Sequence, residues 1–311
     1  MNRFTLAIHG GAGTILKEEM NPPLEQAYRN GLQEALEKGF AVLHKGGSSV
    51  EAVKTAVMVL EDNELFNAGK GSVFTNEGNH EMDASIMEGK SLNAGAVGAV
   101  KNIRNPVELA EKIMLHSGHV FLGGDGALEF ARQMGVATES NDYFFSQFRY
   151  DQWQQVIDSD SFQLDHNVKT RHDKKFGTVG AVACDQFGNL AAATSTGGMT
   201  NKKFGRMGDT PVIGSGTYAN NNTCAISCTG HGEIFLKAVA AYDVSALMEY
   251  KGYSLQQAME HVVNKKLLTL EGEGGMIGVD AQGNASLVFN SAGMYRGLIR
   301  SDGTCAVEIY R

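Results

Sequence analysis

The sequence predicts a layered α+β sandwich with two antiparallel sheets inside, and three observations support this prediction. In each half of the chain, short strand patterns are combined with a pair of helical patterns. Two turn signals of the same type, DQFGN at 185–189 and DAQGN at 280–284, join neighbouring strand patterns as hairpins. Hydrophobic residues make up 42% of the 311 residues, which is enough to bury one substantial core. We therefore expect a single structural domain.

The first half is expected to begin with a buried strand over residues 4–8, followed by a glycine-rich segment. Helical spacing then covers 24–43. Ser48 and Glu51 match the capping-box pattern, which predicts a second helix over about 49–61. Strand patterns follow at 72–75, 82–87 and 95–100, and helices are expected from Asn105-Pro106 to His116 and over 127–133.

A polar, charged stretch without periodicity, from about 139 to 177, separates the two halves, and its composition predicts a linker or mobile segment. In the second half, strands are expected at 178–184, 190–194, 276–279, 286–290, 293–298 and 305–310. Two helices are expected between them, over 233–250 and from the capping residue Ser254 to 268.

Composition argues against several classes of partner. The net charge is −8, without the clusters of Lys and Arg that bind phosphate backbones or anionic membranes, so nucleic acid is not expected as a partner. No apolar run approaches the ~18 residues that span a bilayer, and the opening residues lack the apolar core of a signal peptide. We therefore expect a cytoplasmic protein with no membrane partner. Its four cysteines, Cys184, Cys224, Cys228 and Cys305, are expected to be free thiols.

Common catalytic signatures are absent, including the nucleophile elbow, the phosphate-binding loop, the dinucleotide fingerprint and the zinc-protease motif. Cys224, Cys228 and His231 could supply three metal ligands, but the set is incomplete, and buried free cysteines are the better interpretation. The segment His9-Gly10-Gly11 could form an oxyanion loop. Without a nucleophile elbow, however, a strand end where chains pass closely is the favoured interpretation.

Thr178 stands at the first position of a buried strand, directly after the polar stretch. If the bond between Gly177 and Thr178 were cut, the new α-amine, with a pKa of ~7.7–8.0, could act as general base for the hydroxyl of the same residue. The hydroxyl could itself make the cut by attacking the preceding carbonyl, and a glycine there tolerates the strained backbone this requires. Taken alone, Thr178 is better explained as an ordinary β-branched strand residue.

A series of motifs in a fixed order changes that interpretation. They are HGGAG (9–13), NAGKG (67–71), GTVGAV (177–182), TSTGG (194–198), GRMGD (205–209), TGHGE (229–233) and NSAGMYRG (290–297). Together they resemble the plant-type asparaginase and isoaspartyl peptidase family of N-terminal-nucleophile hydrolases over nearly the whole chain. The resemblance implies a four-layer αββα sandwich. It also implies an α subunit of residues 1–177, a β subunit of residues 178–311, and a dimer of such αβ units.

The resemblance also implies catalytic roles. Thr178 would be the nucleophile, freed by autoproteolysis at the bond after Gly177, and Thr196 would orient and activate it. Thr229 and the backbone N–H of Gly230 would form the oxyanion hole, in which each donor is typically worth ~2.7–4 kcal/mol. The remaining catalytic residue, reaching the nucleophile from the α subunit, would be Asn67.

For the substrate, the resemblance implies that Arg206 binds the α-carboxylate and Asp209 the α-ammonium, as the geometry of these charged groups favours. Without the neighbouring motifs, the two residues would be better explained as a surface ion pair. The same two loops would contribute four further substrate-binding residues: Met207, Gly208, His231 and Gly232. His231 could touch the substrate or simply pack, and the sequence leaves both open.

The segment 60–70 resembles a loop whose main-chain carbonyls hold a structural sodium ion. The implied ligands are the carbonyl oxygens of Leu60, Glu61, Asn63, Phe66, Ala68 and Lys70. No cofactor is expected for catalysis.

The resemblance thus implies an isoaspartyl peptidase with L-asparaginase activity that hydrolyses β-aspartyl dipeptides and asparagine through a threonine acyl-enzyme. A glycosylasparaginase-like amidase is the nearest alternative, although such enzymes are typically lysosomal or secreted, and a taspase-like endopeptidase is a weaker one. An uncleaved, non-catalytic protein that binds aspartyl ligands is also open, since Arg206 and Asp209 could bind a ligand whether or not Thr178 is free. The sequence does not rank asparagine against dipeptides.

Overall fold

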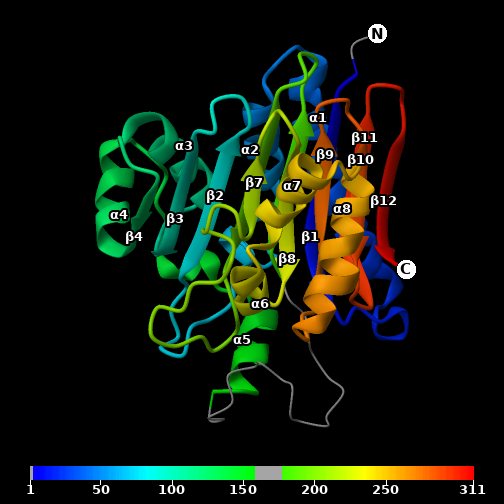
Figure 1. Ribbon diagram of the computed structural model, residues 1–311. Helices are drawn as coiled ribbons and strands as arrows, with labels where there is room; N and C mark the ends of the chain where they lie inside the picture. The colour runs from blue at the N-terminus through cyan, green and yellow to red at the C-terminus, as the bar shows by residue number, and fades with distance from the viewer. Residues whose placement is uncertain (1–2, 158–176) are drawn as a thin grey trace.

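The computed structural model describes residues 3–157 and 177–311, which form two β-sheets (Figure 1). The larger sheet has eight strands: β1 (Thr5–Gly13), β2 (Met82–Glu88), β3 (Ala94–Val100), β4 (Phe121–Gly123), β5 (Val179–Cys184), β6 (Leu190–Thr196), β11 (Gly293–Arg300) and β12 (Cys305–Tyr310). The smaller sheet has four strands: β7 (Thr217–Ala219), β8 (Cys224–Gly230), β9 (Gly274–Asp280) and β10 (Ala285–Phe289).

Helices contact both sheets. The larger sheet is contacted by α1 (Pro22–His44), α2 (Ser49–Glu61), α3 (Pro106–His116) and α4 (Gly124–Gln133). The smaller sheet is contacted by α6 (Gly232–Ala238), α7 (Ala240–Lys251), α8 (Leu255–His261) and its π-helical continuation η4 (Val262–Leu267). The remaining helical segments are α5 (Gln147–Gln154) and the 3₁₀ turns η1 (Lys17–Glu19), η2 (Gly69–Gly71) and η3 (Asn141–Phe144). Within the described ranges, we find no helix with the length and apolar character needed to cross a membrane.

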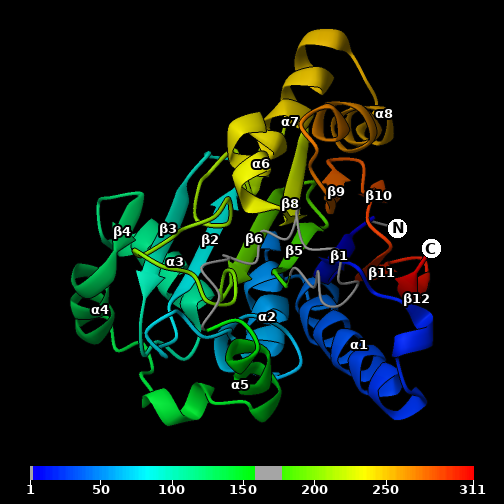
Figure 2. The same cartoon turned by 90° about the horizontal axis from the view of Figure 1, so that it is seen from below.

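The two sheets face each other, since β5 contacts β8 and β1 contacts β9. Figure 2 shows α6, α7 and α8 on one side of the strands and α1 and α2 on the other. The strand order is β12-β11-β1-β5-β6-β2-β3-β4 in the larger sheet and β10-β9-β8-β7 in the smaller. Paired strands are antiparallel except β3 and β4, which α3 connects as a parallel crossover. The prediction of two antiparallel sheets is therefore confirmed apart from this edge.

Both faces of the larger sheet are buried. Along β1, Leu6 belongs to the apolar cluster under the helices of the larger sheet, whereas Ala7 belongs to the cluster between the sheets. This alternation follows from the two-residue period of a strand. Ala7 shares the cluster between the sheets with Val182 and Ile277, and a third cluster, including Ile226, lies between the smaller sheet and its helices.

The Asn105 side chain makes no capping hydrogen bond at the start of α3, but two other predicted helix starts carry the cap that the sequence indicates. The Ser48 hydroxyl accepts a hydrogen bond of 3.2 Å from the backbone N–H of Glu51, as the sequence predicts. A complete capping box is found at Ser254 and Gln257. A polar side chain at each of these starts pairs backbone N–H groups that the first helical turn leaves without a partner.

The strand expected over 72–75 is not formed, and only Thr75 makes an isolated bridge, to Lys202. The backbone N–H of Val73 donates to the side chain of Asn67 at 3.0 Å. That of Ser72 donates to the carbonyl of the preceding 3₁₀ turn. Because local partners take these N–H groups, they are unavailable to a strand ladder.

The linker expected over 139–177 is wrong for residues 139–157, which fold, while 158–176 lie outside the described residues. The charged Arg149 is buried, and its Nε donates to the carbonyl of Gly71 at 2.9 Å. Trp153 stacks on Phe74 with ring centroids 5.4 Å apart. The polar composition was misleading here because these side chains pack against the rest of the folded domain.

The helix expected over 233–250 is divided into α6 and α7 at Val239, whose φ is +49°. At the start of α7, the backbone N–H groups of Ala241 and Tyr242 donate to carbonyls of Ser215 and Gly214. These bonds to a neighbouring loop replace helical ones and account for the break. No glycine or proline marks this position in the sequence.

All four cysteines are free, as predicted, and three of them are buried. Burial raises the pKa of the Cys224 thiol to about 12 and also raises that of Cys228. Neither is thus a ready thiolate ligand, which agrees with the interpretation of these residues as core thiols.

One glycine substitution tests the packing of α3 on the larger sheet, and a second, in α4, is its control. A Cβ at Gly95 would stand 2.0 Å from the carbonyl oxygen of Ala110, so Gly95→Ala should destabilise the protein by about 1–3 kcal/mol. Gly126, in α4, has no described atom within 4 Å of such a Cβ, so Gly126→Ala should stabilise by about 0.4–1 kcal/mol. Denaturant unfolding measures both, and equal effects of the two substitutions would contradict this packing.

Candidate active site

The register between β5 and β6 places two threonines side by side at one end of the larger sheet. Val179 pairs with Ser195, so the next residues outward are Thr178 and Thr196. Thr178 is only 8% exposed. Its Oγ1 donates a hydrogen bond to Thr196 Oγ1 at 3.3 Å. The structure thus brings together the two threonines that the sequence analysis singled out.

The Thr196 hydroxyl also contacts the peptide group ahead of Thr178. Thr196 Oγ1 donates to the carbonyl oxygen of Gly177 at 2.9 Å and accepts from the backbone N–H of Gly198 at 3.0 Å. A hydrogen bond to a carbonyl oxygen stabilises the negative charge that develops there when the carbon is attacked. One hydroxyl therefore adjoins both the candidate nucleophile and the carbonyl that it would attack.

Asn67 lies against this peptide group. A Cβ at Gly177 would stand 2.4 Å from the Cβ of Asn67, so only glycine fits this approach. The Asn67 side chain is held at both ends, because its Nδ2 donates to Gly198 O at 2.8 Å and its Oδ1 accepts from the Val73 N–H at 3.0 Å. The structure thus places Asn67 beside Gly177, the residue next to Thr178.

Arg206 is bound by a carboxylate of the protein. Its Nε and Nη2 both donate to Glu233, at 2.9 Å each, in a bidentate pair. Glycines surround the guanidinium: a Cβ at Gly208 would lie 3.1 Å from Nη1, and one at Gly232 would lie 2.8 Å from Nη2. These glycines therefore pack closely on the guanidinium, where a larger residue would displace it.

Asp209 is buried close to Arg206. Burial raises the pKa of its carboxyl to about 7, and the charge of Arg206 opposes this shift. Oδ2 has no hydrogen-bond partner among the described residues. A buried carboxyl in this condition costs free energy when it ionises, and a cation bound beside it would lower that cost.

A hollow connects these groups. It is lined by Gly177, Thr178, Thr196, Gly198, Met199, Arg206, Gly208, Asp209, Thr210, Gly230 and Gly232. Most of the predicted catalytic and substrate-binding residues therefore share one surface, although they come from segments far apart in the sequence.

Four of the predicted catalytic and substrate-binding residues do not line this hollow, and one of them is Asn67, which lies behind Gly177. Thr229 is buried, and its Oγ1 accepts from the backbone N–H of Ala12 at 3.2 Å. His231 is also buried, with Nε2 3.6 Å from Glu233. The sulfur of Met207 lies 2.4 Å from where Gly98 would carry a Cβ, against β3. Their functional roles remain predictions.

In the predicted sodium loop, two of the main-chain carbonyl oxygens lie close to glycines, and those of Leu60, Asn63, Phe66 and Ala68 accept backbone hydrogen bonds. A Cβ at Gly69 would stand 2.4 Å from Glu61 O, and one at Gly71 would stand 2.0 Å from Phe66 O. Main-chain oxygens suit a hard cation. Across the described ranges, no group of three His, Cys, Asp or Glu side chains could hold a metal, so a cation here would depend on these carbonyls. The sodium ion remains a prediction.

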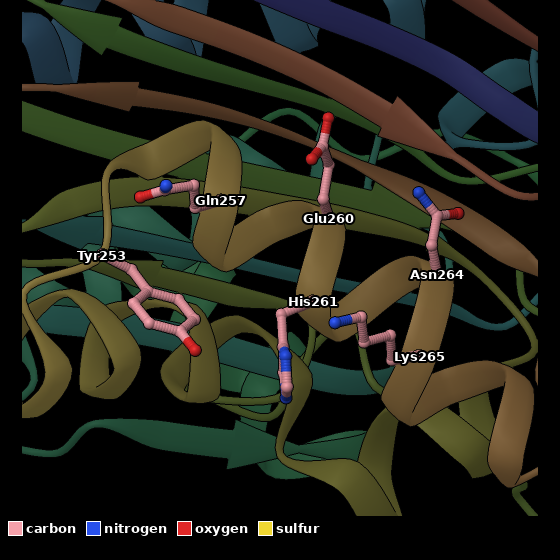
Figure 3. A pocket seen from close by; sticks show the side chains of 6 residues that line it. All are labelled: Tyr253, Gln257, Glu260, His261, Asn264 and Lys265. Carbon is pink, nitrogen blue, oxygen red and sulfur yellow. The ribbon is translucent and has the colours of Figure 1, made fainter.

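A larger hollow, of about 440 Å³, lies on the outer surface of α8 and η4. Its lining residues are Tyr253, Gln257, Glu260, His261, Asn264 and Lys265. Figure 3 shows Glu260 and Asn264 pointing to one side of the helix and His261 to the other. The two hollows have no lining residue in common. We place the candidate active site at the smaller one, because it contains Thr178 and the other predicted residues.

Two residues of the site were missed by the sequence analysis. Glu233 closes the TGHGE motif, but nothing in its spacing shows that it pairs with Arg206. His9 was interpreted as part of a close strand passage, and its neighbour Gly10 does pack against the ring of Phe66. The imidazole of His9 also contacts the Thr178 carbonyl oxygen, at 2.8 Å from Nδ1.

Comparison with known proteins identifies the family of this chain. A family model described as asparaginase matches residues 2–309. An isoaspartyl peptidase from Salmonella typhimurium is 49% identical over 312 residues, covering 100% of both chains. An isoaspartyl peptidase from Escherichia coli is 47% identical over 312 residues, covering 100% of this chain and 97% of the relative. A probable isoaspartyl peptidase/L-asparaginase from Arabidopsis thaliana is 37% identical over 331 residues, covering 100% of both. The resemblance is thus confirmed, and this chain belongs to the asparaginase family whose members include the isoaspartyl peptidases.

Proposed function

We propose that this chain is an isoaspartyl peptidase with L-asparaginase activity that activates itself by cutting the bond between Gly177 and Thr178. Family membership and the names of its relatives support the activity. The observation that carries the mechanism is the Thr196 hydroxyl, which contacts both Thr178 Oγ1 and Gly177 O.

Self-cleavage begins when Thr178 Oγ1 attacks the carbonyl carbon of Gly177. A C–O bond forms, the C–N bond breaks, and the hydroxyl proton ends on the released amine of Thr178. Thr196 donates to the carbonyl oxygen that becomes negative. Water then hydrolyses the ester, which leaves a carboxylate on Gly177 and a free hydroxyl and α-amine on Thr178.

Turnover repeats the same chemistry on a substrate. The Thr178 α-amine takes the proton from Oγ1, which attacks the side-chain carbonyl of a β-linked aspartyl residue or of asparagine. The leaving amine, or ammonia, takes that proton as the C–N bond breaks, and water releases aspartate from the acyl-enzyme. Thr229 and the Gly230 N–H are the proposed donors to the substrate oxyanion, and Asn67 completes the site beside the nucleophile.

Substrate recognition is assigned to Arg206 and Asp209. Arg206 would bind the α-carboxylate through its remaining N–H groups while Glu233 holds the guanidinium in place. The unpartnered Oδ2 of Asp209 would accept from the α-ammonium. An isoaspartyl residue at an N-terminus presents both of these free α-groups, whereas an internal peptide bond does not.

The family supports further proposals about assembly. The two facing sheets, with helices on their outer sides, would form the four-layer αββα sandwich of N-terminal-nucleophile hydrolases. Residues 1–177 and 178–311 would become α and β subunits, and two αβ units would form a dimer. A sodium ion held by the carbonyls of the 60–70 loop would have a structural role. The free buried thiols agree with a cytoplasmic location.

The most direct test of function is substrate choice. The wild-type protein should hydrolyse β-Asp-Leu and asparagine but not α-Asp-Leu or N-glycosylated asparagine, because only the first two present a β-carbonyl with a small leaving group. Thr178→Ala should remove both cleavage and hydrolysis while the protein stays folded by circular dichroism. Action on glycosylated asparagine would favour a glycosylasparaginase. Aspartate binding by an uncleaved, inactive wild-type chain would favour a non-catalytic binder.

Asp209 gives a second prediction, in which the pH dependence has a definite sign. The pKa of its carboxyl is about 7 in the folded protein and ~3.9 in the unfolded chain. The free energy of unfolding is therefore highest below pH ~3.9, where the carboxyl is neutral in both states, and it falls as the pH rises to 7. Asp209→Asn cannot ionise and should raise Tm by about 2–4 °C at pH 8, but less at pH 5. It should also lower kcat/KM by about 30-fold or more. A lower Tm at pH 8 with unchanged KM would contradict this assignment.

A further inference from the structure

A line of buried polar side chains crosses the interior between the two sheets, and the proposed mechanism leaves it unused. It consists of His9, Ser227, Thr194, Thr217 and Ser85, and we call it the hydroxyl chain. All five side chains are fully buried. Polar groups in such a place are costly unless they are paired, so their arrangement requires an explanation.

The hydroxyl chain connects two main-chain carbonyls through hydrogen bonds. In order, the contacts are Thr178 O to His9 Nδ1 (2.8 Å), His9 Nε2 to Ser227 Oγ (2.8 Å), Ser227 Oγ to Thr194 Oγ1 (2.7 Å), Thr194 Oγ1 to Thr217 Oγ1 (2.5 Å), Thr217 Oγ1 to Ser85 Oγ (2.7 Å) and Ser85 Oγ to Thr210 O (2.6 Å). A longer contact of 3.4 Å joins Thr194 to Gly216 O. The side chains come in turn from β1, β8, β6, β7 and β2, so each link between them passes from one sheet to the other.

The two ends of the hydroxyl chain lie at the two halves of the proposed site. One end holds the carbonyl of Thr178, the nucleophile, and the other holds the carbonyl of Thr210, which directly follows Asp209. A motif glycine makes room for the first links. A Cβ at Gly180 would stand 2.0 Å from Ser227 Oγ and 2.5 Å from His9 Nε2, which explains why the GTVGAV segment has glycine there.

The protons of the hydroxyl chain do not suffice for all its contacts. A carbonyl oxygen can only accept, so His9 carries its proton on Nδ1. Burial lowers the pKa of His9 to about 3, so the ring is neutral near pH 7 and Nε2 accepts. The neutral ring and four hydroxyls then hold five protons for the six contacts of 2.8 Å or less, and the 3.4 Å contact of Thr194 with Gly216 O would require a further proton. One contact is therefore without a proton, and its position depends on which way the hydroxyls point.

Because the hydroxyl chain has one proton too few, the orientation of each hydroxyl depends on that of the others. If one hydroxyl turns, its neighbours must turn as well, and the empty contact moves along the line. An element with alternative arrangements that two sites both bias is the physical requirement for coupling between them.

We propose that His9 is a positioning residue for Thr178, and that the hydroxyl chain couples the backbone of the nucleophile to the Asp209–Thr210 loop. This inference rests on the proposed function, which makes Thr178 at one end the nucleophile and Asp209 beside the other end a substrate-binding residue. Through it, substrate binding at Asp209 and the placement of Thr178 respond to one another without direct contact.

A double-mutant cycle on the cleaved enzyme tests the coupling. Ser227→Ala and Ser85→Ala each remove one hydroxyl near opposite ends, and kcat and KM are measured with β-Asp-Leu. Each single variant should lower kcat/KM about 10-fold, the effect of one lost hydrogen bond, and should change both kcat and KM. The kcat/KM of the double variant should be little lower than that of either single variant, because the loss of one hydroxyl already interrupts the hydroxyl chain. Effects that multiply to about 100-fold would overturn the proposal, as would a Ser85→Ala variant with unchanged kcat.

Matched variants separate positioning from general destabilisation. Thr223 and Ser245 form a buried hydroxyl pair at 2.6 Å outside the hydroxyl chain. Thr223→Val should therefore lower Tm while kcat and KM stay within about 2-fold of the wild type. Within the chain, Thr217→Ser keeps the hydroxyl and should retain activity, whereas Thr217→Val should not. Equal losses in these two Thr217 variants would indicate a packing role only and would overturn the proposal.

A spectroscopic measurement decides the coupling even if the protein proves not to be a peptidase. In ¹⁵N-histidine-labelled protein, the His9 signal should show a protonated Nδ1 and an unprotonated Nε2. Ser85→Ala should shift that signal although Ser85 does not touch the ring, whereas Thr223→Val should leave it in place. A His9 signal unchanged in Ser85→Ala would overturn the coupling. A wild-type protein inactive on both substrates would instead reject the proposed function.

Discussion

The register between β5 and β6 is the constraint on which the site depends. Because Val179 pairs with Ser195, the Thr196 hydroxyl meets both Thr178 Oγ1 and Gly177 O. A slip of one residue would turn Thr196 to the opposite face of the sheet and separate these groups. The ladders of β1 with β5 and of β2 with β6, on either side, hold the register in place. The chemistry proposed for this chain is thus a consequence of how two central strands are paired.

Around this pair, glycines determine how closely polar groups can approach. Gly177 admits Asn67, Gly180 admits the contact between His9 and Ser227, and Gly232 admits the guanidinium of Arg206. Each position belongs to one of the motifs in the sequence. The short glycine segments of the sequence therefore mark where side chains from distant strands approach the backbone so closely that a Cβ would not fit.

Much of this could be predicted from the sequence, for identifiable reasons. Long periodic segments such as α1 and α2 gave clear signals, and the hairpin turns placed β5 beside β6. Thr178 gained its meaning only from motifs far along the chain. What failed depended on tertiary contacts: the inward-facing Arg149 in a polar stretch, the helix break at Val239, and the side chain of Asn67 that takes the Val73 N–H.

In the candidate site, too, some features could be predicted from the sequence and others depended on tertiary contacts. The family resemblance indicated Arg206 and Asp209, but the pairing of Arg206 with Glu233 and the burial that raises the pKa of Asp209 depend on three-dimensional packing. The hydroxyl chain is a further example, because serines and threonines on separate strands have no common sequence pattern. Sheet topology alone brings them into one line.

In the proposed mechanism, breaking the bond before Thr178 creates the catalytic group. The most direct measurement follows purified full-length chain over time, with N-terminal sequencing and intact mass of the fragments beside the rate of β-Asp-Leu hydrolysis. We expect a new N-terminus at Thr178 and activity that rises in proportion to the cleaved fraction. Full activity in a chain that stays whole, or that is cut elsewhere, would contradict this mechanism.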